Sequence, residues 1–131
     1  CDGLPATAMR MGEPVVFRID YDMPYPLYRP EIIMEIMNEQ NIRAFLLSTS
    51  YDGFRMGELS GKGSIFIDAG NVPLNQGNYF IRLVLKQDGR VIEATDPATK
   101  LDIVPTDVFG HGEIPKKGQG FFYWSANWKL G

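Results

Sequence analysis

The sequence has very few of the residues on which most catalytic and metal sites depend. Its 131 residues include one cysteine, Cys1, and one histidine, His111. A single thiol cannot form an internal disulfide, and a histidine between two glycines lacks the further ligands that a zinc site needs. We therefore expect no disulfide, no metal site and no cofactor.

Long apolar runs and excess positive charge are also missing. No stretch of about 18 apolar residues is present, so we expect no membrane-spanning helix. The formal net charge of −3 argues against nucleic-acid binding, which usually requires a basic face. The first residues carry neither an initiator methionine nor the basic and apolar regions of a signal peptide. A start at Cys1 is what we expect of a piece of a longer protein.

Recognisable catalytic motifs are absent as well. Residues 57–64 are similar to a phosphate-binding loop, but the glycine spacing is one residue short and Gly63 stands where Ser or Thr should bind magnesium. Several acidic residues offer carboxylate pairs for a glycosidase, although no pair is favoured over another. We expect no catalytic residue. The acidic residues considered were Asp52, Glu58, Asp68, Asp88, Glu93, Asp96 and Asp102.

The sequence is instead rich in short alternating segments separated by Gly, Pro, Asn and Asp. In residues 15–23 and 78–86, apolar side chains recur at every second position, which is typical of half-buried strands. Residue pair Asp88-Gly89 predicts a two-residue hairpin turn. Proline-rich residues 23–30 are expected to form an extended connection and residues 51–63 a glycine-rich loop. The further expected strands cover residues 32–37, 42–48, 64–68, 90–95 and 100–104.

This pattern predicts a single all-β domain over residues 1–131. About seven or eight short strands with turns between them indicate an immunoglobulin-like or jelly-roll antiparallel β-sandwich. In strand 78–86 we expect Tyr79, Ile81, Leu83 and Leu85 to face the core, with Phe80, Arg82 and Lys86 facing outward.

Aromatic and polar side chains on the predicted loops and outer faces favour a carbohydrate site. A sugar ring presents apolar faces flanked by hydroxyls, so it binds flat aromatic rings beside polar groups. Trp124 and Trp128 are better explained as core or interface residues, because tryptophan is mostly buried. Phe80 has an alternative role in covering a neighbouring strand or a partner subunit. The candidate binding residues are Tyr51, Asp52, Phe54 and Arg55 in one loop and Phe80 and Arg82 on one strand.

Several segments resemble the C-terminal carbohydrate-binding domains of Wzt-type subunits, the ATP-binding subunits of O-antigen ABC transporters. Residues 72–85 are similar to the family's Leu-x-x-Gly-x-Tyr-x-Leu-x-Val strand, with Gly77 at the turn and Tyr79 in the core. Residues 101–112 resemble its closing strand and Asp-Val-Tyr-Gly-x-Gly segment. Residues 118–128 match its ending, with Trp128 at the terminal tryptophan, and residues 12–19 resemble its opening strand. Residues 42–50 depart from the family pattern.

The resemblance implies a non-catalytic module that binds the terminal end of lipid-linked O-antigen polysaccharide for export. It implies an immunoglobulin-like sandwich that forms a homodimer by exchanging the C-terminal strand, here the segment from Phe121 to Trp128. The ATPase would lie in an N-terminal domain of the full-length protein. The full-length protein would also contact the transmembrane transporter subunit. The expected location is cytoplasmic, peripheral to the inner membrane.

Two other interpretations stay open. The same fold serves structural or protein-interaction domains without glycan specificity, and fold alone does not separate these functions. A signal peptide upstream would favour that interpretation, whereas an upstream ATPase domain would favour the export module. A glycosidase ranks third, since no carboxylate pair is singled out.

Overall fold

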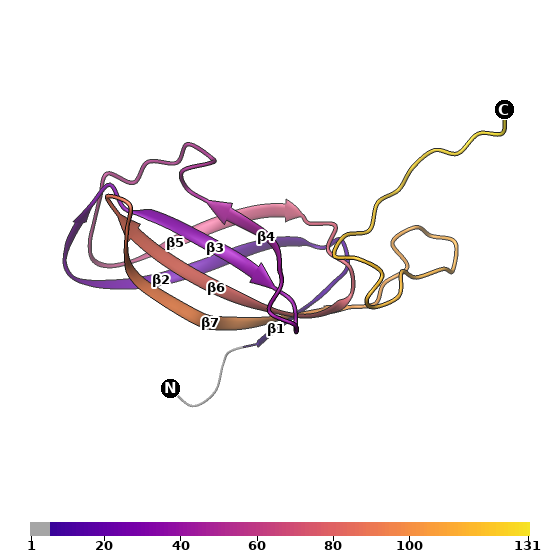
Figure 1. Cartoon of the computed structure of the whole chain (residues 1–131), viewed down its shortest axis with the longest axis horizontal. Coiled ribbons are helices and arrows are strands. Elements are labelled where there is room, and N and C mark those ends of the chain that lie inside the picture. The colour runs from indigo at the N-terminus through magenta and orange to yellow at the C-terminus, as the bar shows by residue number, and fades with distance from the viewer. Residues whose placement is uncertain (1–5) are drawn as a thin grey trace.

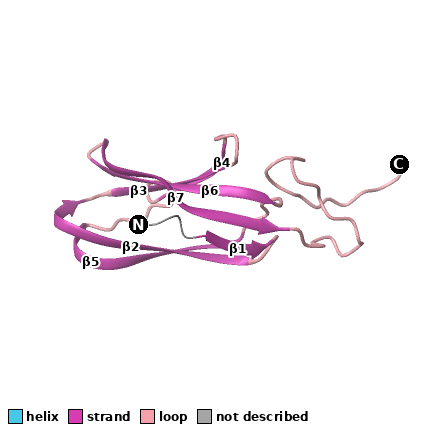
Figure 2. Cartoon of the chain, turned by 90° about the horizontal axis from the view of Figure 1, so that it is seen from below, coloured by secondary structure: helices cyan, strands magenta, loops and turns pink. Residues whose placement is uncertain are grey.

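Seven β-strands build two facing sheets in the computed structural model, which describes residues 6–131 (Figures 1 and 2). One sheet has five strands in the order β1-β7-β6-β3-β4, and the other pairs β2 with β5. Within these residues there is no helix. The predicted all-β sandwich is therefore confirmed. The strands are β1 (Ala6–Arg10), β2 (Pro14–Tyr28), β3 (Glu31–Met37), β4 (Arg43–Ser48), β5 (Glu58–Asn71), β6 (Gly77–Gln87) and β7 (Arg90–Val104).

The five-stranded sheet is mixed, which corrects the expectation of purely antiparallel pairing. Strand β1 runs parallel to the last part of β7, from the pair Ala6–Lys100 to the pair Arg10–Val104. All other pairings are antiparallel. Parallel neighbours cannot be joined by a tight hairpin, and β1 is instead followed by β2 in the opposite sheet.

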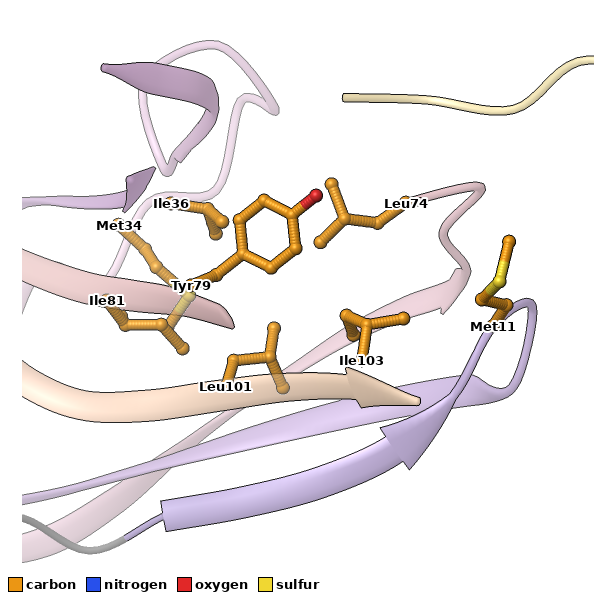
Figure 3. Close-up of a cluster of buried hydrophobic side chains, with 8 residues drawn as sticks. All are labelled: Met11, Met34, Ile36, Leu74, Tyr79, Ile81, Leu101 and Ile103. Atoms are coloured by element: carbon orange, nitrogen blue, oxygen red, sulfur yellow. The ribbon is translucent and has the colours of Figure 1, made fainter. Parts of the chain in front are cut away.

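The core lies between the two sheets and is built from alternate residues of each strand (Figure 3). Ile36 is fully buried, and Met34, Tyr79 and Ile81 are nearly so. Partly buried side chains of β2 and β5, including Phe17, pack against them from the two-stranded sheet. The two-residue periodicity predicted for residues 15–23 is confirmed, because exposed and half-buried positions alternate along that part of β2. The remaining members of the buried cluster are Met11, Leu74, Leu101 and Ile103.

Three of the four residues predicted to face the core from β6, Tyr79, Ile81 and Leu83, pack in it. Tyr79 and Ile81 are buried as expected, but Leu83 and Leu85 are half-buried while Val84, on the other face, is 6% exposed. The register between β6 and β7 is interrupted between Ile81 and Leu83. The extra residues of this bulge lie on β7, whereas β6 pairs with β3 without interruption, so alternate residues of β6 keep to the same face.

Two segments expected to be loops belong to strands. The proline-rich residues 23–28 continue β2, and Glu58 to Gly63 begin β5. The prolines are tolerated because β2 has only one neighbour and because its register with β5 is irregular between Met23 and Leu27. Residues 90–95 and 100–104 likewise form one strand, β7, rather than two.

The glycines that resemble a phosphate-binding loop have a packing role in β5. Gly63 lies opposite Tyr21 of β2, and the Tyr21 hydroxyl occupies the space that a side chain at position 63 would need. Gly61 adopts a positive φ of 65° opposite Met23, where β2 begins its irregular stretch. Most of this segment is a strand, whereas a phosphate-binding loop is followed by a helix.

The predicted hairpins are confirmed. Strands β3 and β4 pair across residues 38–42, where the Asn38 side chain accepts hydrogen bonds from the backbone N–H groups of Gln40 and Ile42. Asp88 and Gly89 both have positive φ, 52° and 75°, as a type I′ turn between β6 and β7 requires.

One buried side chain, Asn75, fastens the chain that follows β7 to the sandwich. Its Nδ2 donates to the backbone oxygens of Lys116 (2.9 Å) and Gly120 (3.3 Å), and its backbone N–H donates to Phe121 O (2.7 Å). Its own backbone oxygen accepts a hydrogen bond from the Tyr79 hydroxyl at 3.0 Å. Asn75 is 1% exposed, so its side of these bonds is shielded from water, although Lys116 and Gly120 are themselves exposed.

We predict that Asn75→Ala lowers the free energy of unfolding by about 1–3 kcal/mol, because the backbone oxygens of Lys116 and Gly120 lose their donor. Asn71→Ala is the matched control. Asn71 is exposed and donates one bond, to Gly12 O, so its loss should cost less than about 1 kcal/mol. Urea unfolding followed by circular dichroism measures both, and equal losses for the two variants would contradict the anchoring role.

Candidate functional site

Three connections meet at one end of the sandwich, on the left of Figure 1. The backbone N–H of Tyr28 donates to Gln87 Oε1 at 2.9 Å, which joins the end of β2 to the β6–β7 hairpin. The backbone N–H of Arg29 bonds to Gly57 O, which joins the same turn to the β4–β5 loop. These bonds hold the three connections together as one surface.

That surface contains a concavity of about 620 Å³, which we call the loop-end hollow. Phe54 is 56% exposed at its wall. Three cations line it, Arg29, Arg55 and Lys86, and none of them forms an ion pair with any residue in the range 6–131. The hollow thus combines a flat aromatic ring with guanidinium and ammonium donors that are free to bind a ligand. Its lining comprises Arg29, Pro30, Glu31, Thr49, Ser50, Gly53, Phe54, Arg55, Met56, Gly57, Lys86, Asp88 and Gly89.

The structure separates the four candidate residues of the β4–β5 loop. Phe54 and Arg55 line the loop-end hollow, whereas Tyr51 is 81% exposed and is not among its lining residues. Asp52 lies with Phe54 at a smaller hollow of about 220 Å³ between the two sheets. Backbone bonds from Asp52 to Ser48 and from Phe54 to Thr49 fold the loop so that neighbouring side chains diverge.

The other two candidates, Phe80 and Arg82, lie on the outer face of the five-stranded sheet. Arg82 Nη1 lies 3.1 Å from Glu35 Oε1, and Arg43 Nη1 lies 3.2 Å from Glu35 Oε2. Lys100 Nζ lies 5.8 Å from the centroid of the Phe80 ring, a cation–π distance. Both candidates already have partners within the domain.

Glu35 is the centre of a charge network across four strands. Its side chain is 10% exposed, so the two guanidinium groups supply the hydrogen bonds that water would otherwise give. On the far side of Arg82, Nε lies 3.8 Å from Asp96 Oδ2, too far for a hydrogen bond. Arg82 is therefore first a structural partner of Glu35, and its part in ligand binding stays a prediction.

The outer face of β6 connects Phe80 and Arg82 to the loop-end hollow. Alternate residues of a strand share one face, so Arg82 and Lys86 point the same way, with Cα atoms about 13 Å apart. Lys86 lines the hollow. The two groups of candidates thus lie along one surface, although they come from different elements.

Sequence analysis missed Arg29 and Lys86 as candidates. Arg29 falls in the segment expected to be a simple connection, and it adopts a positive φ of 50° before Pro30. Lys86 was read only as an outward residue of its strand. The available signal was weak: each is a cation at the end of an apolar segment, beside a turn.

Neither a metal-binding cluster nor a membrane-spanning helix is present among the described residues. Within residues 6–131 there is no group of three or more His, Cys, Asp or Glu residues placed to hold a metal ion. The same residues include no helix with the length and apolar character needed to cross a membrane.

Comparison with solved structures gives a clear match. The structure is similar to the crystal structure of the C-terminal domain of Wzt, with a TM-score of 0.74 over 94% of this chain and 73% of that chain. This chain has the fold of the Wzt C-terminal domain. The resemblance noted in the sequence is thereby confirmed at the level of the fold, at 8% sequence identity. No protein-family model and no curated protein matches the sequence.

Low identity to the Wzt domain is compatible with a shared fold. A sandwich needs alternating apolar side chains and turns at the right places, and many different residues satisfy both. The surfaces outside the core carry no such requirement. A similar fold therefore does not show that this chain and the Wzt domain share binding residues.

We predict that Glu35→Ala lowers the free energy of unfolding by about 1–2 kcal/mol, because it leaves Arg43 and Arg82 facing each other without the carboxylate. Asp20→Ala, which breaks the exposed pair with Arg18 and the exposed hydrogen bond from Ser64 Oγ, is the control and should have a smaller effect. Chemical denaturation of both variants measures the difference. A loss for Glu35→Ala no greater than for Asp20→Ala would show that the network is not structural.

Proposed function

We propose that this chain is a non-catalytic carbohydrate-binding module. The observation that carries the proposal is the loop-end hollow, where exposed Phe54 lies beside Arg55 and two further unpaired cations. Aromatic faces bind the apolar faces of sugar rings, and guanidinium groups donate paired hydrogen bonds to vicinal oxygens. The outer face of β6, with Phe80 and Arg82, extends the same surface.

The likeness to the Wzt domain supports a particular ligand and context. We propose that the ligand is the terminal end of a lipid-linked O-antigen polysaccharide and that the module presents it to an ABC transporter. The ATPase and the contacts with the transmembrane subunit would belong to other parts of the full-length protein. This proposal places the module at the cytoplasmic side of the inner membrane.

The C-terminal segment supports a homodimer formed through residues 121–128. Phe121 and Tyr123 pack against the sandwich, and Phe122 forms an isolated bridge with Leu74. Beyond them the chain extends away from the body (Figures 1 and 2), and Trp124 and Trp128 are 81% and 92% exposed. Of the two roles expected for these tryptophans, core or interface, their exposure excludes the core of their own chain.

A second copy is a natural partner for this segment. Large exposed apolar side chains on an extended chain are costly in water, and unpaired strand edges bind further strands. The sandwich offers such edges at both sides of the β2–β5 pair and at β1 and β4. In the proposed dimer, each copy supplies its tail to an edge of the other.

We predict that Phe54→Ala combined with Arg55→Ala weakens binding of the cognate O-antigen at least about tenfold, because a stacking contact and a charged hydrogen bond are lost. Isothermal titration calorimetry with purified polysaccharide measures this. Glu113→Ala, an exposed change outside the hollow, is the control. Unchanged affinity in the double variant would disprove this site; no binding by the native chain would favour a protein-interaction domain.

We predict that the chain is a dimer and that removing residues 124–131 makes it a monomer, since the exposed tryptophans leave with the tail. Residues 121–123 are kept because they pack against the sandwich. Sedimentation equilibrium gives the mass of each form, and circular dichroism checks that the shortened chain is folded. A dimer that survives the truncation would contradict exchange of this segment.

A further inference from the structure

A second concavity lies at the opposite end of the sandwich, where the β3–β4 hairpin meets the β5–β6 connection and the segment after β7. Its volume is about 400 Å³. Carboxamides dominate its lining, and we call it the amide hollow. It is lined by Asn38, Glu39, Gln40, Gln76, Gly77, Asn78, Tyr79, Lys117, Gly118, Gly120 and Phe121.

Several hydrogen-bonding groups of the amide hollow are free to bind a ligand. Asn38 uses its Oδ1 in the hairpin turn and Gln76 uses its Nε2 to bond Pro115 O at 2.7 Å. This leaves Asn38 Nδ2, Gln76 Oε1 and both polar atoms of Gln40 without a partner among the described residues. Each carboxamide offers donors and acceptors in one plane, which suits the adjacent hydroxyls of a sugar.

The two walls of the amide hollow are joined by an ion pair. Lys117 Nζ lies 2.9 Å from Glu39 Oε1, and this hydrogen bond holds the pKa of Glu39 below its usual range. The Asn78 side chain makes a smaller contribution in the same direction to the pKa of Glu39. Because the two charges cancel, the hollow carries no net charge, whereas the loop-end hollow has three cations and two carboxylates, Glu31 and Asp88, in its lining.

The wall formed by the segment after β7 is fixed in place. Asn75 bonds the backbone of Lys116 and Gly120, so the residues between them are held against the β5–β6 connection. Gly118 and Gly120 have positive φ, 86° and 100°, and present backbone rather than side chain to the hollow. A fixed polar surface loses little entropy when a ligand binds.

The amide hollow lies on the same surface as the proposed saccharide site. Asn78, Phe80, Arg82 and Lys86 share one face of β6, and they lead from the amide hollow to the loop-end hollow. The Cα atoms of Asn78 and Lys86 are about 27 Å apart along the strand. An extended oligosaccharide, but not a single sugar, can span this distance.

We propose that the amide hollow is a second saccharide subsite, which binds an uncharged, hydroxyl-rich sugar residue of the same chain that occupies the loop-end hollow. The inference rests on the proposed carbohydrate-binding function and adds to it the class of sugar and a minimum ligand length. The module would then recognise a stretch of the polysaccharide as well as its end.

The test is an NMR titration of the full chain with neutral mono- to hexasaccharides of hexoses, 6-deoxyhexoses and N-acetylhexosamines. We expect long chains to shift amide signals at both hollows and to bind more tightly than monosaccharides. The variant Gln40→Ala with Asn78→Ala should lose the shifts at the amide hollow and bind the longest ligand about tenfold more weakly. Glu113→Ala is the control, and thermal melting confirms that each variant is folded.

The outcomes separate the two proposals. Shifts confined to the loop-end hollow, with affinity independent of chain length, would overturn the second subsite and leave the proposed function standing. Equal affinity of the double variant and the control for the longest ligand would also overturn it. No shift with any saccharide, including the cognate polysaccharide, would overturn both.

Discussion

Only two strands cover the inner face of a five-stranded sheet. The length of these two strands and the free surfaces of the molecule both follow from this difference in sheet size. Strands β2 and β5 are long, at 15 and 14 residues, and their alternating apolar side chains pack across the larger sheet. Because they are long, β2 includes the proline-rich residues 23–28 and β5 includes the glycine-containing residues 58–63. Because the Tyr21 side chain lies over β5, a side chain at position 63 would displace the Tyr21 ring.

The same arrangement leaves the outer face of the large sheet and the two ends of the sandwich free for other uses. On the outer face, Glu35 is held by Arg43 and Arg82, which keeps a charged surface rigid without an apolar covering. At the ends, short connections bring together residues that are distant in the sequence. One end collects cations and an aromatic ring, and the other collects carboxamides. In the proposed recognition of the polysaccharide, two chemically different hollows bind the ligand, and the outer face of β6 connects them.

The segment after β7 couples these surfaces to the proposed dimer. Asn75 holds its first part against the sandwich, where Lys117 and Phe121 line the amide hollow. Only beyond Tyr123 does the chain leave the body with its tryptophans exposed. The residues proposed to bind sugar and those proposed to bind a second copy are thus adjacent in the sequence of this segment.

The sequence by itself determined the class of fold, the hairpins and most of the strands, because two-residue periodicity and turn residues are local properties. It also identified Phe54 and Arg55, which proved to line a hollow, as aromatic and polar residues on a loop. Only the tertiary structure decided that β1 is parallel to β7, that Arg29 and Lys86 line one hollow with Phe54, and that Gln40 and Asn78 line another with Lys117. These neighbours come from segments far apart in the chain, and they are set by how the two sheets pack rather than by any local pattern.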